Sequence, residues 1–345
     1  DMYLAGLARW IGASGLSVIQ ILIGFWIYLI YGKLRRKDHF KKIFVLGFLA
    51  IAFLHLFGGL INPINRNSDY PFAVWQTNIP TREKINLNEQ FIKDKLFAAQ
   101  KYALSNEAKL LIAPEGTLNK NFNLVKGSKI NMLVGGFRDF NNELRSSLLG
   151  YKIGDQFHTS FIDKNRLVPL GEKIPGFLDI FSRGLSAVGG VQPGPDSRFF
   201  DTKFTPPLAV AICYEISDGL QIRNAINGGA ELIISIANLD PYPTKLHNQF
   251  LSLARLRSIE NKKDNVIVSN TGPSGLISDD GGIIKLFEPN TEINEIIYPN
   301  FSSKKTFYSK YGDRPLLFLF VSLIVLNLFL IIFVCEICNL DSDVT

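Results

Sequence analysis

The sequence is poor in charge, in cysteine and in histidine. Only 20% of its 345 residues are charged, whereas 47% are hydrophobic and the mean hydropathy is positive. This balance excludes a disordered, collagen-like or coiled-coil chain. Three cysteines are too few for a disulfide framework. The four histidines are scattered, and the C-x-x-C at Cys335 and Cys338 has no second pair, so we expect no metal site.

Long runs without charge are the clearest feature. Residues 11–32 and 43–61 contain no Asp, Glu, Lys or Arg, and residues 315–335 carry only one amide, at Asn327. Each run matches the roughly 20 residues that cross a bilayer. Buried core helices of this length seldom lack charge altogether, so we predict three transmembrane helices. The first run is too long for a secretory signal, and a second run follows it.

The loop between the first two runs sets the expected topology. Residues 33–42 hold six basic side chains and one acidic side chain. A short basic loop between spans is typically cytoplasmic, and without interleaved aromatics or glycines it does not indicate a nucleic-acid partner. Lys304, Lys305, Lys310 and Arg314 would then flank the third span on the outer side, against the same rule, although they follow a long translocated domain.

These features predict three parts. Residues 1–62 form two transmembrane helices joined by the basic loop, residues 63–314 form a domain outside the cytoplasm, and residues 315–345 form a third span with a short tail. Because the chain begins with Asp1, we expect that it is a fragment or a processed chain.

The middle of the chain has the pattern of an α/β domain. Apolar runs at 72–76, 110–113, 132–135, 208–213, 232–237, 266–269 and 283–287 predict strands, and helical spacing covers 88–105 and 247–261. Continuous apolar strands separated by helices predict a mostly parallel sheet that is covered on both faces. The stretch 136–207, rich in Gly and Pro, is predicted to form loops around the site.

Three residues lie at the carboxyl ends of predicted strands, where functional groups of α/β proteins collect: Glu115, Cys213 and Asn238. A buried cysteine is usually an inert hydrophobe, but Cys213 could be a nucleophile if a base is near. Glu115 could be that base, or could simply begin a helix; His158 and His247 are the other candidate bases. Lys164 could stabilise an oxyanion or lie on the solvated surface.

Taken in order, these residues resemble the Glu-Lys-Cys triad of the nitrilase superfamily, most closely its membrane branch, the apolipoprotein N-acyltransferase family. The motifs that carry the resemblance are QTNIP at 76–80, APE at 113–115, DKNRLVPLGE at 163–172, AICYE at 211–215 and ARLRSIE at 254–260. Residues 4–8 and 12–17 resemble the loop and span before that family's catalytic domain. The resemblance covers essentially the whole chain.

The resemblance implies a nitrilase-like αββα sandwich flanked by transmembrane helices in the bacterial inner membrane, with the catalytic domain on the periplasmic side. It also implies acyl transfer from a phospholipid, through a cysteine thioester, to the α-amino group of a diacylglyceryl apolipoprotein, without a cofactor. By motif position Cys213 is the nucleophile, Glu115 the base and Lys164 the oxyanion stabiliser. Glu172, Tyr214 and Glu215 fall on supporting positions.

The sequence departs from the family pattern at two places that bear on docking of the acyl chain or the acceptor. Ile85 stands where the family usually has Trp, and 239–243 (LDPYP) replaces an aromatic pair. The family also has about five more spans upstream. Two other functions are open at this stage: a membrane-anchored amidase using the same three residues, and an inactive lipid-binding remnant.

Overall fold

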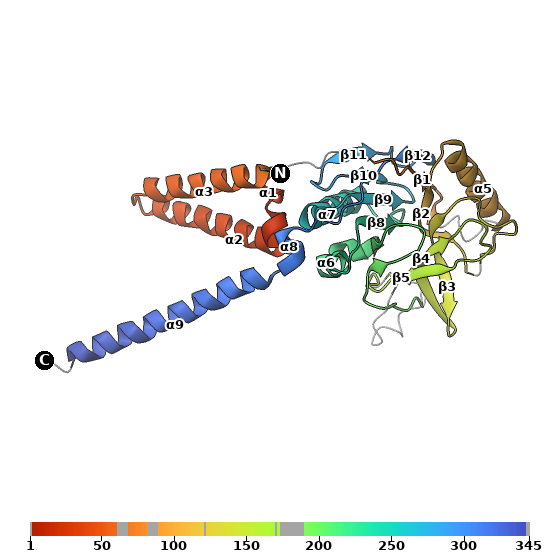
Figure 1. Ribbon diagram of the computed structural model, residues 1–345. Coiled ribbons are helices and arrows are strands. Elements are labelled where there is room, and N and C mark those ends of the chain that lie inside the picture. Colours follow the sequence, from red (N-terminus) through yellow and green to blue (C-terminus); the bar gives the residue numbers. More distant parts are fainter. Residues whose placement is uncertain are drawn as a thin grey trace.

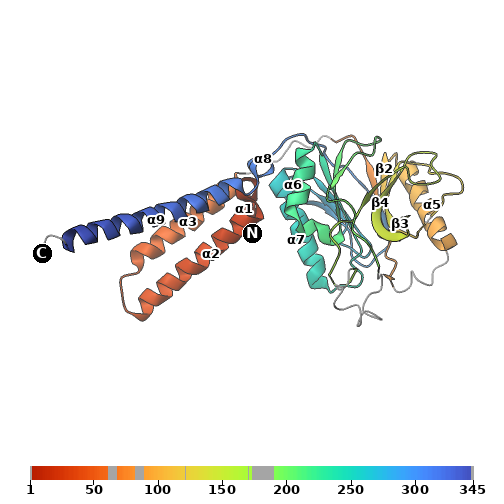
Figure 2. The same ribbon diagram turned by 90° about the horizontal axis from the view of Figure 1, so that it is seen from below.

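The computed structural model describes residues 2–60, 68–81, 89–120, 122–169, 171–172 and 190–342, with side chains from Tyr3 to Ile331. Figure 1 shows an α/β domain from one side of which long helices extend, and Figure 2 shows the same arrangement from below. The helices are α1 (Met2–Ala5), α2 (Ala8–Arg35), α3 (Lys41–Gly59), α5 (Glu89–Ser105), η2 (Cys213–Ser217, a 3₁₀ helix), α6 (Gly219–Asn227), α7 (Thr244–Asn261), α8 (Phe307–Tyr311) and α9 (Arg314–Ser342).

Three of these helices contain the three uncharged runs of the sequence, and they flank the domain. Among the described residues, α2, α3 and α9 are long and apolar enough to cross a membrane. Their large side chains, such as Phe25, Leu46 and Phe318, are mostly exposed. Apolar surface of this extent is costly in water but not in lipid. The prediction of apolar helices flanking the α/β domain is therefore confirmed.

The strands form two six-stranded sheets. The first has the order β12 (Ile293–Ile297), β1 (Phe72–Gln76), β2 (Leu110–Leu118), β3 (Met132–Phe140), β4 (Glu143–Tyr151), β5 (Ser160–Asp163). The second has the order β11 (Ile283–Leu286), β10 (Gly275–Ile277), β9 (Asn265–Ser269), β8 (Leu232–Ala237), β7 (Leu208–Ile212), β6 (Phe199–Phe200).

The expectation of one mostly parallel sheet was wrong in two respects. Within the described ranges there are two sheets, and among their named strands parallel pairing is confined to β1–β2–β3 and β7–β8–β9. The outer strands of each sheet pair antiparallel. Parallel neighbours need long crossover connections, whereas hairpins add antiparallel edge strands from segments with weaker apolar runs.

The expectation of loops throughout 136–207 was also wrong. β3 continues to Phe140, turns at Asn141 and Asn142, and returns as β4. Both asparagines have positive φ, of 53° and 64°, as a tight hairpin turn requires. The end of the hairpin next to the turn is exposed and carries charged residues, so its strands lack the continuous apolar run that marks the central strands.

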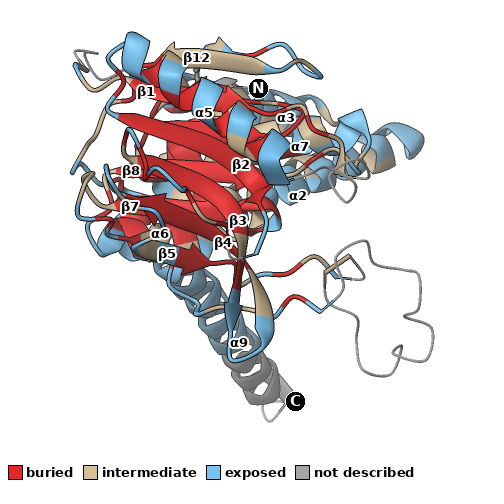
Figure 3. Ribbon diagram, turned by 90° about the vertical axis from the view of Figure 1, so that its right-hand side faces the viewer, coloured by how far each residue is buried: buried red, intermediate tan, exposed pale blue. Residues whose placement is uncertain are grey.

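The domain has four layers in the order helix, sheet, sheet, helix. Alternate residues of β1 show this plainly: Phe72 and Val74 face the second sheet, whereas Ala73 and Trp75 pack with α5. α6 and α7 cover the second sheet, and Figure 3 shows the buried strands between partly exposed helices. This is the nitrilase-like αββα arrangement that the resemblance implied. The central strands β1, β2, β7, β8 and β9 are buried on both faces, so polar groups of these strands can reach solvent at the strand ends.

Candidate functional site

Cys213 lies where β7 gives way to η2, one residue after the strand ends at Ile212. Its backbone has a positive φ of 55°, which is unusual for a residue with a side chain. Conformations of this kind cost about 1–3 kcal/mol and cluster at functional sites. The side chain is 7% exposed, so it touches solvent only through the cavities described below.

Glu115 lies in β2 at an irregularity in the pairing with β3, between Ala113 and Leu118. The irregularity turns its carboxylate into the site instead of along the strand. A close approach of the two backbones makes this possible: a Cβ on Gly135 of β3 would lie only 2.5 Å from the Cα atom of Glu115. Gly135 therefore has to be glycine for β2 to hold Glu115 where it is.

Lys164 follows β5 directly and is completely buried. Its Nζ atom donates to Glu115 Oε1 at 2.8 Å and to Glu172 Oε1 at 2.6 Å. Burial alone would lower the pKa of Lys164, but the negative charges of Glu115 and Glu172 raise it well above its ordinary value. The ammonium group is therefore charged, and two of its three N–H donors are used by carboxylates.

Other groups hold the two carboxylates in place. Glu115 accepts from Ser146 Oγ at 3.3 Å and from the backbone N–H of Asn238 at 3.1 Å. Glu172 accepts from the backbone N–H of Val168 at 2.8 Å. Burial raises the pKa of Glu172, and the charge of Lys164 opposes that rise.

The thiol of Cys213 is neutral at neutral pH. Burial, followed by the negative charge of Glu115, raises its pKa to about 12, although Lys164 acts in the opposite direction. A reaction at this sulfur therefore needs a base that removes the proton as the sulfur attacks. Glu115 is a candidate for this base, because it lines, together with Cys213, the more polar of the two cavities described below.

Glu215, in η2, joins the Cys213 and Lys164 segments. Its carboxylate accepts from the backbone N–H groups of Asn165 at 2.6 Å and of Ile212 at 2.9 Å. It also pairs with Arg198 Nη1 at 2.8 Å, and both side chains are 2% exposed. A buried charge pair satisfied in this way fixes the position of both loops relative to each other.

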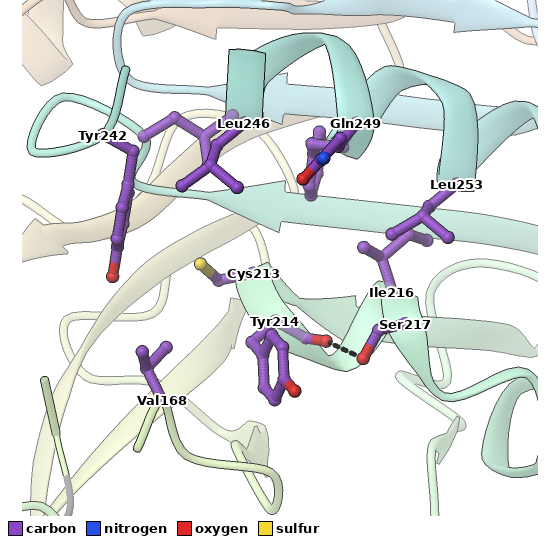
Figure 4. Close-up of a pocket in the computed structure, with 11 residues that line it drawn as sticks. Val168, Cys213, Tyr214, Ile216, Ser217, Tyr242, Leu246, Gln249 and Leu253 are labelled. Atoms are coloured by element: carbon purple, nitrogen blue, oxygen red, sulfur yellow. Dashed lines mark hydrogen bonds between the residues drawn. The ribbon is translucent and has the colours of Figure 1, made fainter. Parts of the chain in front are cut away.

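Two cavities of about 260 Å³ each meet at Cys213. The polar cavity is lined by Glu115, Ser146, Glu172 and Asn238 together with apolar residues. The other cavity is almost entirely apolar, and Figure 4 shows the sulfur of Cys213 beside it. Its lining consists of Val168, Cys213, Tyr214, Ile216, Ser217, Leu239, Tyr242, Leu246, Gln249, Phe250 and Leu253.

The structure thus brings the three predicted site residues together and gives their three predicted neighbours distinct places. Glu172 contacts Lys164 directly and Glu215 ties two loops together. Tyr214 stands at the apolar cavity with the guanidinium of Arg166 5.1 Å from its ring.

The two candidate histidine bases lie elsewhere. Within the described part of the chain, neither His158 nor His247 lines a cavity at Cys213. His158 packs against the rings of Tyr151 and Phe161, and His247 hydrogen-bonds to the carbonyl of Leu239 at 2.9 Å.

Of the two departures from the family pattern, the structure describes one. Leu239 and Tyr242 form part of the apolar wall, so this substitution lies at the site itself. Ile85 lies outside the described residues, as do the side chains of Cys335 and Cys338.

Sequence reasoning missed several residues that complete the site. Arg198 comes from a Gly- and Pro-containing segment that carries no recognisable pattern, and Ser146 lies within the unpredicted strand β4. Asp163 was predicted only as the first residue of the motif at 163–172, without a role of its own. It accepts from Arg138 Nε at 2.6 Å and from Ser147 Oγ at 2.7 Å, and so anchors the strand end before Lys164. Only the order of neighbouring strands could have revealed these partners.

Comparisons with known proteins agree with this geometry. No family model matches the chain. The chain is 72% identical over 329 residues to an apolipoprotein N-acyltransferase of Prochlorococcus marinus subsp. pastoris, covering 95% of this chain and 66% of the relative. It is 44% identical to an apolipoprotein N-acyltransferase of another Prochlorococcus marinus strain, covering 92% of this chain and 64% of that relative. The chain therefore spans a little under two thirds of the length of these curated relatives.

A solved structure matches the fold. An amidase of the nitrilase superfamily from Nesterenkonia superposes with a TM-score of 0.52 at 15% identity, covering 73% of this chain and 97% of the amidase. The high identity to the curated relatives extends through the α/β domain and its flanking helices. The chain belongs to the apolipoprotein N-acyltransferase family, and its α/β domain has the fold of that amidase.

Proposed function

We propose that this chain carries the catalytic part of an enzyme that moves a fatty acyl chain from a membrane phospholipid to an apolipoprotein. The acyl chain is held in between as a thioester on Cys213. The acceptor is the α-amino group of the diacylglyceryl-cysteine at the N-terminus of the apolipoprotein. The relatives' names support this activity.

One observation carries the proposal: the sulfur of Cys213 lies where an apolar cavity meets a polar one. An acyl chain needs an apolar cavity, because each buried CH₂ group contributes about 0.8 kcal/mol. The ester carbonyl needs the charged groups next to the thiol. A site for small polar amides would need only the second cavity.

In the first half of the reaction, Cys213 Sγ attacks the ester carbonyl while Glu115 takes the thiol proton. The negative oxygen of the tetrahedral intermediate is stabilised by the ammonium group of Lys164, whose third N–H remains for it. The C–O bond then breaks, Glu115 returns the proton to the leaving alcohol, and a lysophospholipid departs. The acyl chain stays on the sulfur as a thioester.

In the second half, the α-amino group of the acceptor attacks the thioester carbonyl. Glu115 takes a proton from the attacking nitrogen, and Lys164 again stabilises the oxyanion. The C–S bond breaks, the sulfur regains a proton, and an amide is formed. A thioester is reactive enough for this step, so no further energy source is needed.

We also propose the placement of these parts. Helices α2, α3 and α9 span a bacterial inner membrane, with residues 33–42 in the cytoplasm. Residues 63–314 form the catalytic domain on the periplasmic side, and residues 315–345 form the last span and tail. A site at this level lets both lipid substrates enter from the membrane.

The adduct on Cys213 tests the proposal directly. The full chain in vesicles should gain one acyl group on Cys213 from radiolabelled phospholipid without acceptor, and neutral hydroxylamine should release it. Cys213→Ala should abolish the adduct. Glu115→Gln and Lys164→Ala should each slow its formation by about 10²-fold or more. The double variant should be little worse than either single one, because the groups act as a unit.

Glu288→Gln is the matched control, since this glutamate is exposed and remote from both cavities. Addition of a diacylglyceryl lipopeptide should then transfer the label to its amino group. Release of free fatty acid without transfer would support an amidase-like hydrolase instead. Unimpaired adduct formation in Glu115→Gln would remove the carboxylate from the mechanism.

A further inference from the structure

A larger cavity, of about 470 Å³, lies where the α/β domain meets the start of α9. α6 and α8 lie side by side there in both ribbon views (Figures 1 and 2). The cavity is lined by Leu220, Arg223, Asn224, Tyr308, Tyr311, Asp313, Arg314 and Leu317. None of these residues lines the cavities at Cys213, so the acyl-transfer site does not account for this one.

Arg223 is held in this cavity by the backbone of α8. Its Nε atom donates to the carbonyl of Tyr308 at 3.1 Å, and its Nη2 atom donates to the carbonyl of Lys310 at 3.3 Å. A Cβ on Gly312 would lie 2.8 Å from the central carbon of the guanidinium, so glycine is needed there. The guanidinium is therefore fixed in advance, and among the described residues its Nη1 atom has no acceptor.

A second guanidinium, that of Arg314, lines the same cavity and is exposed. Within the described ranges no ion pair joins it to Asp313, the one acidic residue of the lining. The segment 304–314 holds four basic residues and one acidic residue. These are the basic residues whose place outside the last span runs against the usual charge distribution of membrane proteins.

Apart from Asn224, the rest of the lining is apolar or aromatic, and three of these side chains are exposed. Leu220 is 54% exposed, Tyr311 49% and Leu317 64%. Leu317 lies in the first turn of α9, where the apolar helix begins, and tyrosine is typical of this membrane level. Two cations above an apolar helix surface match a phosphate group whose acyl chains run down into the bilayer.

We propose that this cavity binds the phosphate of an anionic membrane glycerophospholipid between Arg223 and Arg314. Guanidinium groups bind phosphate oxygens through charge-assisted, often paired hydrogen bonds. The acyl chains of the bound lipid lie along Leu317. The inference depends on the proposed function only in placing α9 in a membrane, and it concerns a site where no acyl group is transferred.

Photocrosslinking of the full chain in phosphatidylcholine vesicles tests this inference. A phosphatidylglycerol with a photoactivatable acyl chain should crosslink to peptides of α6 and of residues 307–317. Arg314→Gln should reduce this crosslinking by about fivefold. The combined Arg223→Gln and Arg314→Gln variant should reduce it further. The exposed pair Lys101→Gln and Lys109→Gln removes the same charge from the far side of the domain and should change nothing.

Competing probes separate the possible ligands. A photoactivatable diacylglycerol, which lacks phosphate, should crosslink at this site at least about fivefold less than phosphatidylglycerol. Equal crosslinking by the two lipids would overturn the proposal, as would displacement by millimolar inorganic phosphate or an unchanged signal in both arginine variants. The Cys213 adduct, measured in the same samples, reports acyl transfer separately. Crosslinking without an adduct would leave this site standing and remove the proposed function.

Discussion

The carboxylate of Glu260, in α7, accepts a hydrogen bond of 2.8 Å from the backbone N–H of Ala13, in α2, across 247 positions of the sequence. Gly12 interrupts α2 just before this point, with φ 63° and ψ −173°. Ala13 therefore begins a new helical segment, whose first N–H groups have no partner within the helix. Glu260 caps that segment from the α/β domain, with a charge that suits a helix N-terminus.

This contact links the candidate site to α2, the first of the three long apolar helices. Glu260 is fully buried and pairs with Arg257 Nη1 at 2.7 Å. Burial raises its pKa, and the charge of Arg257 opposes that rise. The same helix, α7, lines the apolar cavity at Cys213 through Leu246 and Leu253. One rigid helix thus relates the cavity to α2.

Two substitutions of Glu260 should separate the cap from the ion pair. Both Glu260→Ala and Glu260→Gln remove the pair with Arg257, but Gln retains an oxygen that can accept from Ala13. Loss of a cap costs about 1 kcal/mol. Hydrogen exchange of the Ala13 amide should therefore be about fivefold faster in Glu260→Ala than in Glu260→Gln. Equal exchange in the two variants would show that the carboxylate does not cap α2.

The thiol of Cys213 should react slowly with iodoacetamide near neutral pH. Alkylation follows the thiolate, and burial raises the pKa to about 12, so the rate should rise about tenfold per pH unit through pH 7–10. Glu115→Gln removes a negative charge that contributes to the raised pKa of Cys213. At pH 8 the variant should be alkylated faster than the original chain, although its adduct from phospholipid forms more slowly. A slower alkylation would contradict the electrostatic role of Glu115.

Replacement of Arg198 should lower the stability of the α/β domain around Glu215. Arg198→Met leaves the buried carboxylate of Glu215 without its cation, a change that typically costs about 3–5 kcal/mol. Urea unfolding of the α/β domain should show this loss in the free energy of unfolding. Arg166→Met is the control, because Arg166 is 45% exposed in its pair with Asp218. A stability equal to that of the control would mean that Glu215 is held by its backbone donors alone.

The orientation in the membrane is open to a labelling test. In a chain without other cysteines, Lys37→Cys lies in the basic loop and Asn123→Cys lies in the α/β domain. In cells whose outer membrane has been removed and whose inner membrane is intact, an impermeant thiol reagent should label only Asn123→Cys. Lysis should make both reactive. Labelling of Lys37→Cys alone would reverse the topology.

Local sequence patterns predicted much of this protein. Uncharged runs predicted α2, α3 and α9, because helix formation and exclusion of charge are properties of a continuous segment. Fully apolar strands such as 232–237 matched the structure to the residue, since both of their faces are buried. Glu115 and Cys213 were selected by their positions at the ends of predicted strands and by their motifs, and Lys164 was selected by its motif.

Only the tertiary structure decided how these pieces meet. The second part of β3 and all of β4 escaped prediction because polar and charged residues interrupt their apolar runs, and the division into two sheets depends on which strands pair. The partners Arg198–Glu215 and Ala13–Glu260 join segments distant along the chain. Such contacts form when separate elements pack, so no local pattern encodes them. The meeting of a polar and an apolar cavity at one sulfur likewise exists only after the two sheets, η2 and α7 have come together.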